Sequence, residues 1–366
     1  MSAVPPGVTV TGTAQRQAWI DRVMPPVELV RPGLWSIPTP FPNSPLRYVL
    51  SYAVEHDGGI ALVDTGWPAE AAWDGLVAGL AEAGWELSDV KAILITHGHG
   101  DHMGLARRLR ERSGAWVAMH EADANPRFDF RTLEDFRRAN DENLRRRGGL
   151  AADFAAVGKG SGPDASTFGE FSLTVDRHLV DGERPLGAGS GLVAIHTPGH
   201  TLGHVSFYDD QRNVMLTGDH ILPRITPNIS PAPGQADDLL GIYLSSLSLL
   251  ADYPAQEVLP AHEYRFAGLR ERVHGLREHH EIRLGEVMTT LHAAPGASTV
   301  VVAEALQWSR PWSQMVGPQR RFAIGEAHSH LIHLEATGFV ANKGAGEDGT
   351  GVDSWYTLRD AGPKLV

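Results

Sequence analysis

THGHGDH, residues 96–102, brings three histidines and one aspartate together directly after a run of apolar residues. His97 and His99 are two positions apart, so in an extended loop their side chains can point to the same side. Asp101 and His102 begin the helical pattern that follows. Imidazole and carboxylate groups gathered in this way favour a metal site over a solvated polar loop, and one such loop can serve two neighbouring ions.

Further potential ligands stand singly, each just past an apolar run. They are Asp64 in ALVDTGW, His200 in HTPGHTLGH, Asp219 in MLTGDHIL and His262 in VLPAHEYR. Residues that follow the ends of buried strands lie where a core stops and a site can open. We therefore expect these four side chains to converge with the loop 96–102.

The surrounding pattern predicts helices layered on sheets. Apolar runs bounded by Gly, Pro or Asp indicate strands at 49–54, 60–63, 92–95, 115–119, 192–195, 205–208, 214–216 and 257–259. Helical periodicity appears at 69–83 and at 103–112, and the polar residues 209–212 suit a hairpin. This alternation predicts an α/β protein of the mixed α+β kind.

Composition narrows the class of protein. The chain has 366 residues, enough for two domains, and 42% of them are hydrophobic, but no apolar stretch approaches the roughly 20 residues that span a bilayer. The absence of cysteine means that any metal is held by nitrogen and oxygen. The net charge of −12 argues against a nucleic acid as partner. The first basic residue is Arg16, so we expect no secretory signal and a cytoplasmic location.

Over roughly residues 33–264, the order of these motifs resembles the metallo-β-lactamase superfamily, with a glyoxalase II-like ligand set. The resemblance implies a four-layer αββα sandwich. It also implies two metal ions, the first held by His97, His99 and His200, the second by Asp101, His102 and His262, with Asp219 bridging them.

The donor set suits two divalent ions, for which Zn²⁺ is our expectation and Fe or Mn are the alternatives. Ions about 3.5–4 Å apart can share a hydroxide, because metal binding lowers the pKa of water towards ~7. We expect this bridging hydroxide to be the nucleophile, with catalytic roles for Asp101 and Asp219. Asp64 would fix the orientation of a histidine ring, and His204 and His220 would support the ligands from behind.

The sequence also predicts a domain organisation. Residues 1–32 would form an N-terminal extension, and 33–268 the catalytic domain, with an insertion at about 121–175 that is either a lid or an ordinary pair of surface helices. In 269–366, three helical segments precede two strand-like runs, which is the winged-helix pattern. The resemblance extends here to the C-terminal domain of a subgroup that includes thioesterases and endoribonucleases. Acidic residues outnumber basic ones in this domain, which argues against DNA binding. We expect the domain to form a cap, a wall of the substrate pocket or a homodimer surface.

Three functions remain open at this level. The first is hydrolysis of a small ester-type substrate, namely a thioester, a lactone or another carboxylic ester. The second is a metal-dependent endoribonuclease or phosphodiesterase, whose basic channel would have to come from the arginines of 127–147. The third, a non-enzymatic binding or regulatory protein, predicts missing ligands, and none is missing. Substrate contacts are expected from loop and pocket residues, namely Trp67, Met103, Arg224, Asn228, Tyr243, Tyr264 and Arg265.

Overall fold

Two β-sheets form the framework of the protein, a computed structural model of which describes residues 4–124, 133–149, 173–232, 235, 237–344 and 351–359. The seven-stranded sheet consists, in spatial order, of β2 (Glu28–Arg31), β3 (Leu34–Pro40), β4 (Tyr48–His56), β5 (Gly59–Val63), β6 (Val90–Leu94), β7 (Trp116–His120) and β8 (Arg177–Leu179). Its strands are antiparallel from β2 to β5 and parallel from β5 to β8.

The six-stranded sheet has mixed directions as well. Its strands, in spatial order, are β1 (Thr9–Val10), β13 (Phe266–Ala267), β12 (Glu257–Pro260), β11 (Val214–Gly218), β10 (Val205–Asp209) and β9 (Leu192–His196). Only the pair β11 and β12 is parallel among the pairings of this sheet in the described residues. β10 and β11 form the hairpin that the sequence predicts around residues 209–212.

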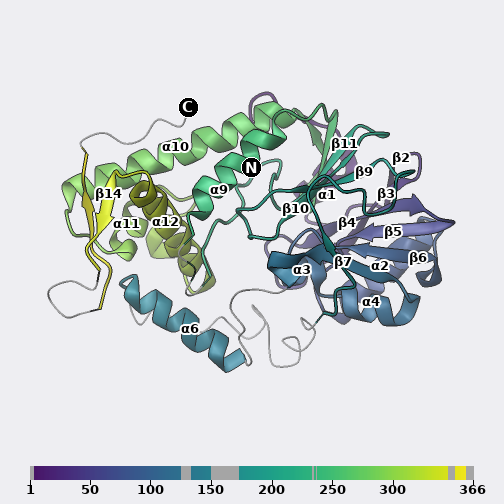
Figure 1. Cartoon of the computed structure of the whole chain (residues 1–366), viewed down its shortest axis with the longest axis horizontal. Helices are drawn as coiled ribbons and strands as arrows, with labels where there is room; N and C mark the ends of the chain where they lie inside the picture. The colour runs from purple at the N-terminus through teal and green to yellow at the C-terminus, as the bar shows by residue number, and fades with distance from the viewer. Residues whose placement is uncertain are drawn as a thin grey trace. The chain divides into compact units, whose positions relative to one another are not determined.

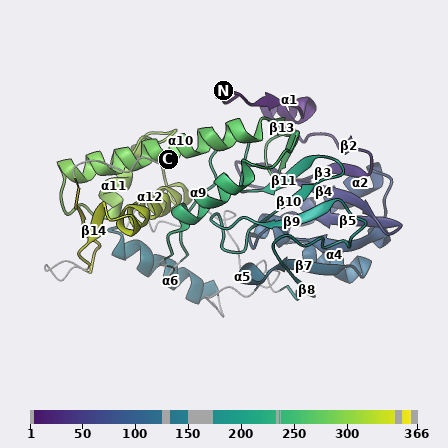
Figure 2. The ribbon, with the colours of Figure 1, turned by 45° about the horizontal axis from the view of Figure 1, so that its top comes forward.

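The two sheets lie face to face across one apolar core (Figure 2). Tyr52 and Val63 contribute to this core from the seven-stranded sheet, and Phe207 and Leu216 from the six-stranded sheet. On its other face, the seven-stranded sheet packs against α2 (Glu70–Glu82) and α4 (Ala106–Ser113) through a second buried cluster (Figure 1). The mixed α/β sandwich predicted from the sequence is therefore confirmed.

The chain forms two compact units. The sheet unit comprises residues 1–127, 163–227 and 246–273, and the helical unit comprises residues 128–162, 228–245 and 274–366. The remaining elements are α1 (Thr13–Asp21), η1 (Leu87–Asp89), α3 (Gly100–Met103), α5 (Glu121–Ala124), α6 (Leu133–Arg146), α9 (Leu239–Leu250), α10 (Leu269–Ala293), α11 (Thr299–Ala305), η2 (Trp312–Gln314), α12 (Pro318–Ala336), β14 (Val340–Asn342) and β15 (Trp355–Thr357). In the described part of the chain, no helix combines the length and the apolar character that crossing a bilayer requires.

Several of these elements bear on the expected domain boundaries. The N-terminal residues contribute strands to both sheets, because β1 pairs with β13 and β2 pairs with β3. In the helical unit, α10, α11 and α12 precede the antiparallel pair β14 and β15, which is the expected order of elements. The assignment of the region 269–366 as a winged helix stays a prediction. Residues 125–132 and 150–172 of the expected insertion lie outside the described residues, so the lid also stays a prediction.

Replacing Phe207 by alanine tests the packing between the sheets. Phe207 is fully buried in the core that both sheets share, so we expect Phe207→Ala to lower the free energy of unfolding by about 3–5 kcal/mol. Urea denaturation followed by tryptophan fluorescence measures this loss. Leu29→Ala is the control, because Leu29 is 61% exposed and its truncation should change stability by less than about 0.5 kcal/mol. Equal stability of the two variants would contradict this packing.

Candidate functional site

The ends of five strands meet at one edge of the sandwich. Asp64 follows β5 and the loop 96–102 follows β6, and these strands are parallel neighbours in the seven-stranded sheet. In the six-stranded sheet, Asp219 and His262 follow the parallel neighbours β11 and β12, and His200 follows β9. The two sheets are joined here, since the backbone N–H of Val205 donates to Thr96 O at 2.8 Å. The predicted convergence of these residues is thus seen in the structure.

His97, His99 and His200 form the first of two groups at this edge. His99 Nδ1 lies 2.9 Å from His97 Nε2 and 3.0 Å from His200 Nε2, so three ring nitrogens point to a common position. Ligands of a tetrahedral Zn²⁺ stand about 3.3 Å apart when each bond is ~2.0–2.1 Å long, which is close to this spacing. His97 and His200 are buried whereas His99 is exposed, so this group can be reached from solvent on the His99 side.

The second group combines imidazoles with carboxylates. His262 Nε2 lies 3.4 Å from Asp101 Oδ2 and 3.2 Å from Asp219 Oδ1, and His102 Nε2 lies 3.7 Å and 3.5 Å from the same two atoms. The other oxygen of Asp219, Oδ2, lies 3.7 Å from His200 Nε2. Asp219 therefore faces both groups, one with each carboxylate oxygen.

Three buried atoms of the second group have no hydrogen-bond partner among the described residues: His102 Nε2, His262 Nε2 and Asp219 Oδ1. A buried polar atom left without a partner costs about 1–3 kcal/mol. Three such atoms that converge within a few ångströms are therefore the mark of a position that a cation can occupy. The donor set fits a divalent metal ion.

The outer ring nitrogens of three histidines are fixed by hydrogen bonds. His102 Nδ1 donates to Asp64 Oδ2 at 2.7 Å, because a carboxylate can only accept. The Thr96 hydroxyl donates to Asp64 as well, so its lone pair accepts from His97 Nδ1 at 3.0 Å. In both rings Nδ1 thereby carries a proton, and Nε2 faces into the site, where it can act as a ligand.

His262 is fixed in the same sense by a backbone group. Its Nδ1 donates to Tyr48 O at 3.0 Å, while the Tyr48 hydroxyl donates to Glu263 O at 2.8 Å. The side chain of Glu263 is buried and accepts a hydrogen bond from Arg224 at 2.6 Å. Tyr48 thus binds this segment twice, once at the side chain of His262 and once at the carbonyl oxygen of Glu263. Sequence analysis did not identify Tyr48, because a backbone acceptor leaves no signal in residue type.

The electrostatics of the two groups differ. Burial lowers the pKa of His97 well below its usual value, and the neighbouring histidines lower it further. Burial acts in the same direction on His102 and His262, but there the facing carboxylates of Asp219 and Asp101 outweigh it. They raise the pKa of His262 to about 10 and the pKa of His102 well above its usual value. Without a metal, these two imidazoles therefore carry protons that neutralise the carboxylates.

His204 and His220 lie behind the first group. The ring centroid of His204 is 5.1 Å from that of His97 and 5.3 Å from that of His220, and His204 Nδ1 lies 2.8 Å from the Thr197 hydroxyl. Burial lowers the pKa of His220 to about 3, so its ring is neutral at physiological pH. These placements accord with the expected supporting role, which stays a prediction.

The residues expected to contact substrate lie in different surroundings. In the sheet unit, the Trp67 ring stacks on Phe41 with centroids 5.1 Å apart, whereas Met103 and Tyr264 are buried. Arg265 donates to the carboxylates of Glu257 and Glu28, and Arg224 to that of Glu263. The other two residues belong to the helical unit, where Asn228 accepts from the Ser230 hydroxyl and Tyr243 is buried beside His280. These positions do not test whether any of the seven residues contacts a substrate, so those contacts stay predictions.

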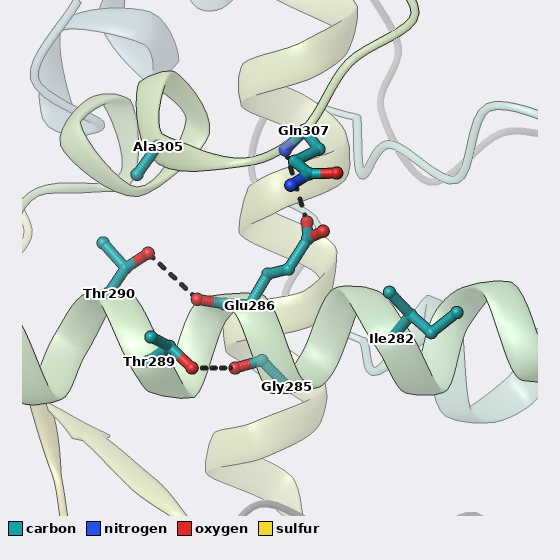
Figure 3. A pocket seen from close by; sticks show the side chains of 7 residues that line it. All are labelled: Ile282, Gly285, Glu286, Thr289, Thr290, Ala305 and Gln307. Atoms are coloured by element: carbon teal, nitrogen blue, oxygen red, sulfur yellow. Dashed lines mark hydrogen bonds between the residues drawn. The ribbon is translucent and has the colours of Figure 1, made fainter.

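A surface pocket is also present in the helical unit, where α10 and the segment around the end of α11 provide its walls (Figure 3). Its lining residues are Ile282, Gly285, Glu286, Thr289, Thr290, Ala305 and Gln307. The Glu286 carboxylate accepts from Gln307 N at 3.3 Å and from Arg283 at 2.7 Å. This pocket includes none of the histidines or aspartates described above and has no comparable donor set.

Comparisons with known proteins agree with this geometry. A metallo-beta-lactamase family protein from Thermus thermophilus, known from a crystal structure, is 29% identical with a TM-score of 0.73, over 90% of this chain and 99% of that chain. A hydroxyacylglutathione hydrolase from Ectopseudomonas mendocina is 29% identical over 211 residues, which cover 57% of this chain and 60% of that protein. An atrochrysone carboxyl ACP thioesterase from Aspergillus terreus is 30% identical over 126 residues, which cover 34% of this chain and 37% of that protein.

The chain thus spans less than two thirds of the length of either curated relative. Residues 44–262, which contain every histidine and aspartate of the site, match the family model described as Metallo-beta-lactamase superfamily. This match extends over more than half of the 366 residues. The chain therefore belongs to the metallo-beta-lactamase superfamily.

Proposed function

We propose that this chain is a hydrolase that uses two divalent metal ions to cleave a small ester-type substrate. The observation that supports two ions rather than one is the position of Asp219, whose Oδ2 faces His200 while its Oδ1 faces His102 and His262. In this proposal His97, His99 and His200 hold one ion, Asp101, His102 and His262 hold the other, and Asp219 contacts both.

The proposed ions are Zn²⁺, because neutral imidazole and carboxylate without thiolate suit this metal. Fe and Mn remain the alternatives. Loading the second group requires that His102 and His262 release the protons that Asp101 and Asp219 stabilise. Metal affinity should therefore rise with pH.

When bound, the two ions would supply Lewis acidity and activate water at neutral pH. The residues of this chain would then divide the remaining tasks. Asp101 and Asp219 would hold the ions and place negative charge beside the reacting centre. Asp64 keeps the rings of His102 and His97 in the orientation that ligation requires, directly in one case and through Thr96 in the other. The exposed His99 marks the side from which substrate approaches.

Two curated relatives support a carbonyl substrate, because one is named a thioesterase and the other a hydroxyacylglutathione hydrolase. We therefore place thioesters first, followed by lactones and other carboxylic esters. The phosphodiesterase alternative needs free arginines. On α6, however, Arg138 pairs with Asp135, and Arg145 and Arg146 pair with Glu142. The acidic side chains beside these arginines offset part of the positive charge that a nucleic-acid channel on this helix would need.

Four related proposals follow from the sequence. The substrate is a small molecule rather than a nucleic acid, the protein works in the cytoplasm, the helical unit is a winged helix, and this unit forms a cap, a pocket wall or a homodimer surface. The acidic balance of the chain, with a net charge of −12, supports the first of these proposals.

Metal analysis tests the proposed centre directly. We expect the purified chain to contain close to two transition-metal ions, measured by inductively coupled plasma mass spectrometry, and His97→Ala to lose hydrolytic activity because one ion loses a ligand. His292→Ala is the matched control, since His292 is exposed near the end of α10. Wild-type protein that is active after complete metal removal would refute the proposal.

A substrate panel distinguishes ester from phosphodiester chemistry. We expect turnover of acyl-thioesters or lactones, and none of bis-p-nitrophenyl phosphate or single-stranded RNA, by the metal-loaded chain. The reason is the pairing of the α6 arginines together with the net negative charge. Phosphodiester turnover without ester turnover would reverse the order of the two functions.

Asp64→Asn tests the hydrogen bonds behind the ligands. The carboxylate accepts from His102 Nδ1 and from Thr96, and an amide cannot accept from all of these donors without turning its NH₂ group towards one of them. We expect metal affinity to fall about 10–100-fold in a chelator-competition titration. Asp57→Asn is the matched control, because Asp57 also has a positive φ but its side chain is 81% exposed. Equal metal affinities of the wild type and Asp64→Asn would contradict the proposed role of Asp64 in orienting the ligands.

A further inference from the structure

We infer that Asp123 is a positioning residue that sets the distance between the two loops carrying His97, His99 and His200. The inference rests on the proposed metal centre but concerns a residue outside it. Asp123 lies on α5, a single turn that directly follows β7. It comes from a different strand than either histidine loop, so it is a third point of attachment for both.

The carboxylate of Asp123 accepts three hydrogen bonds from the two loops. Its Oδ2 accepts from Gly98 N at 2.7 Å and from the Thr201 hydroxyl at 2.6 Å, while its Oδ1 accepts from Gly203 N at 2.7 Å. Gly98 stands between His97 and His99, and Thr201 directly follows His200. One oxygen atom therefore joins the loop of the seven-stranded sheet to the loop of the six-stranded sheet, within one residue of all three histidines.

The space around this carboxylate leaves little freedom for the loops. A Cβ placed on Gly203 would lie 2.6 Å from the backbone nitrogen, the Cγ and the Oδ1 of Asp123. A Cβ placed on Gly98 would lie 3.4 Å from Asp123 Cβ. Gly203 has no positive φ, so its role is to permit the close approach of its loop to Asp123, whereas the distance at Gly98 is an ordinary van der Waals contact.

The effect of Asp123 on the site can be separated from an effect on folding. A second contact already joins the same strand ends, because the rings of His120 on β7 and His196 on β9 stack with centroids 4.0 Å apart. Loss of the Asp123 carboxylate should therefore leave the sheets packed while the two loops lose their common acceptor. The expected consequence is weaker binding of the ion assigned to the three histidines, with the other ion retained.

The test compares Zn²⁺ binding by the full-length wild type, Asp123→Ala and Asp176→Asn, each titrated against a chromophoric chelator. We expect Asp123→Ala to bind one of its two ions about 10–100-fold more weakly. Asp176→Asn is the matched control and should bind as the wild type does. Asp176 likewise accepts a backbone hydrogen bond, from Val117 N at 2.8 Å, but near the beginning of β7 rather than beyond its end.

Thr201 provides a second, milder pair of variants in case Asp123→Ala does not fold. Thr201→Val removes only the hydroxyl that donates to Asp123, whereas Thr201→Ser keeps it. We expect weaker binding of one ion in the first variant and wild-type binding in the second. Unchanged affinity of both ions in Asp123→Ala, or in Thr201→Val if the former does not fold, overturns the positioning role. A wild-type chain that binds no Zn²⁺ overturns the proposed function itself.

Discussion

Burial of like charges is the constraint on which this structure depends. Asp101 and Asp219 both face the interior of the site, and water is largely excluded from their carboxylates. Two carboxylates in such a place need compensating positive charge, because an unpaired buried charge is among the most costly features that a fold can contain. In the protein alone, His102 and His262 provide it by holding protons. In the proposed metal centre, the same side chains would bind divalent cations once these protons leave, so one set of side chains would serve both states.

The geometry of the site is maintained by groups that never point into it. Asp64, which directly follows β5, has a φ of 60°, a conformation that aspartate tolerates better than most residues, and its carboxylate accepts hydrogen bonds from Thr96 and His102. Glu263, next to His262, has a φ of 71° and a backbone oxygen bound by Tyr48. Two uncommon backbone conformations beside the site indicate that the surrounding contacts determine the local chain path.

How far the sequence predicts this fold depends on whether the signal is local. The strands around 60–63 and 92–95 are continuous apolar runs, and β5 and β6 occur there because strands that are buried on both faces of a sheet can be apolar throughout. β3 was missed because LWSIPTP contains two prolines. Both prolines lack a backbone N–H group. They are tolerated because β2 pairs only with residues 34–36 of β3, so on that edge no strand lies beside the prolines to accept a hydrogen bond. α9, with the sequence LLGIYLSSLSLL, was missed because it has no polar stripe to reveal its period.

The candidate site, too, could be predicted from the sequence only where the signal is local. Its histidines and aspartates could be predicted because each stands in a recognisable motif after a strand. Tyr48 could not be predicted, because it acts through its carbonyl oxygen, and Asp123 could not, because the atoms that it binds come from loops distant in the sequence. Contacts of this kind depend on the tertiary fold alone, and they decide how firmly a ligand set is held.

All of the hydrogen bonds that support the two groups, from Tyr48 and Asp64 to Asp123, lie within the sheet unit. The proposed metal centre therefore belongs to this unit alone. Substrate choice is a separate matter, because one fold and one ligand set serve many reactions. It must come from side chains outside the ligand set. We expect the stacked pair Phe41 and Trp67, which follow β3 and β5, to be among them.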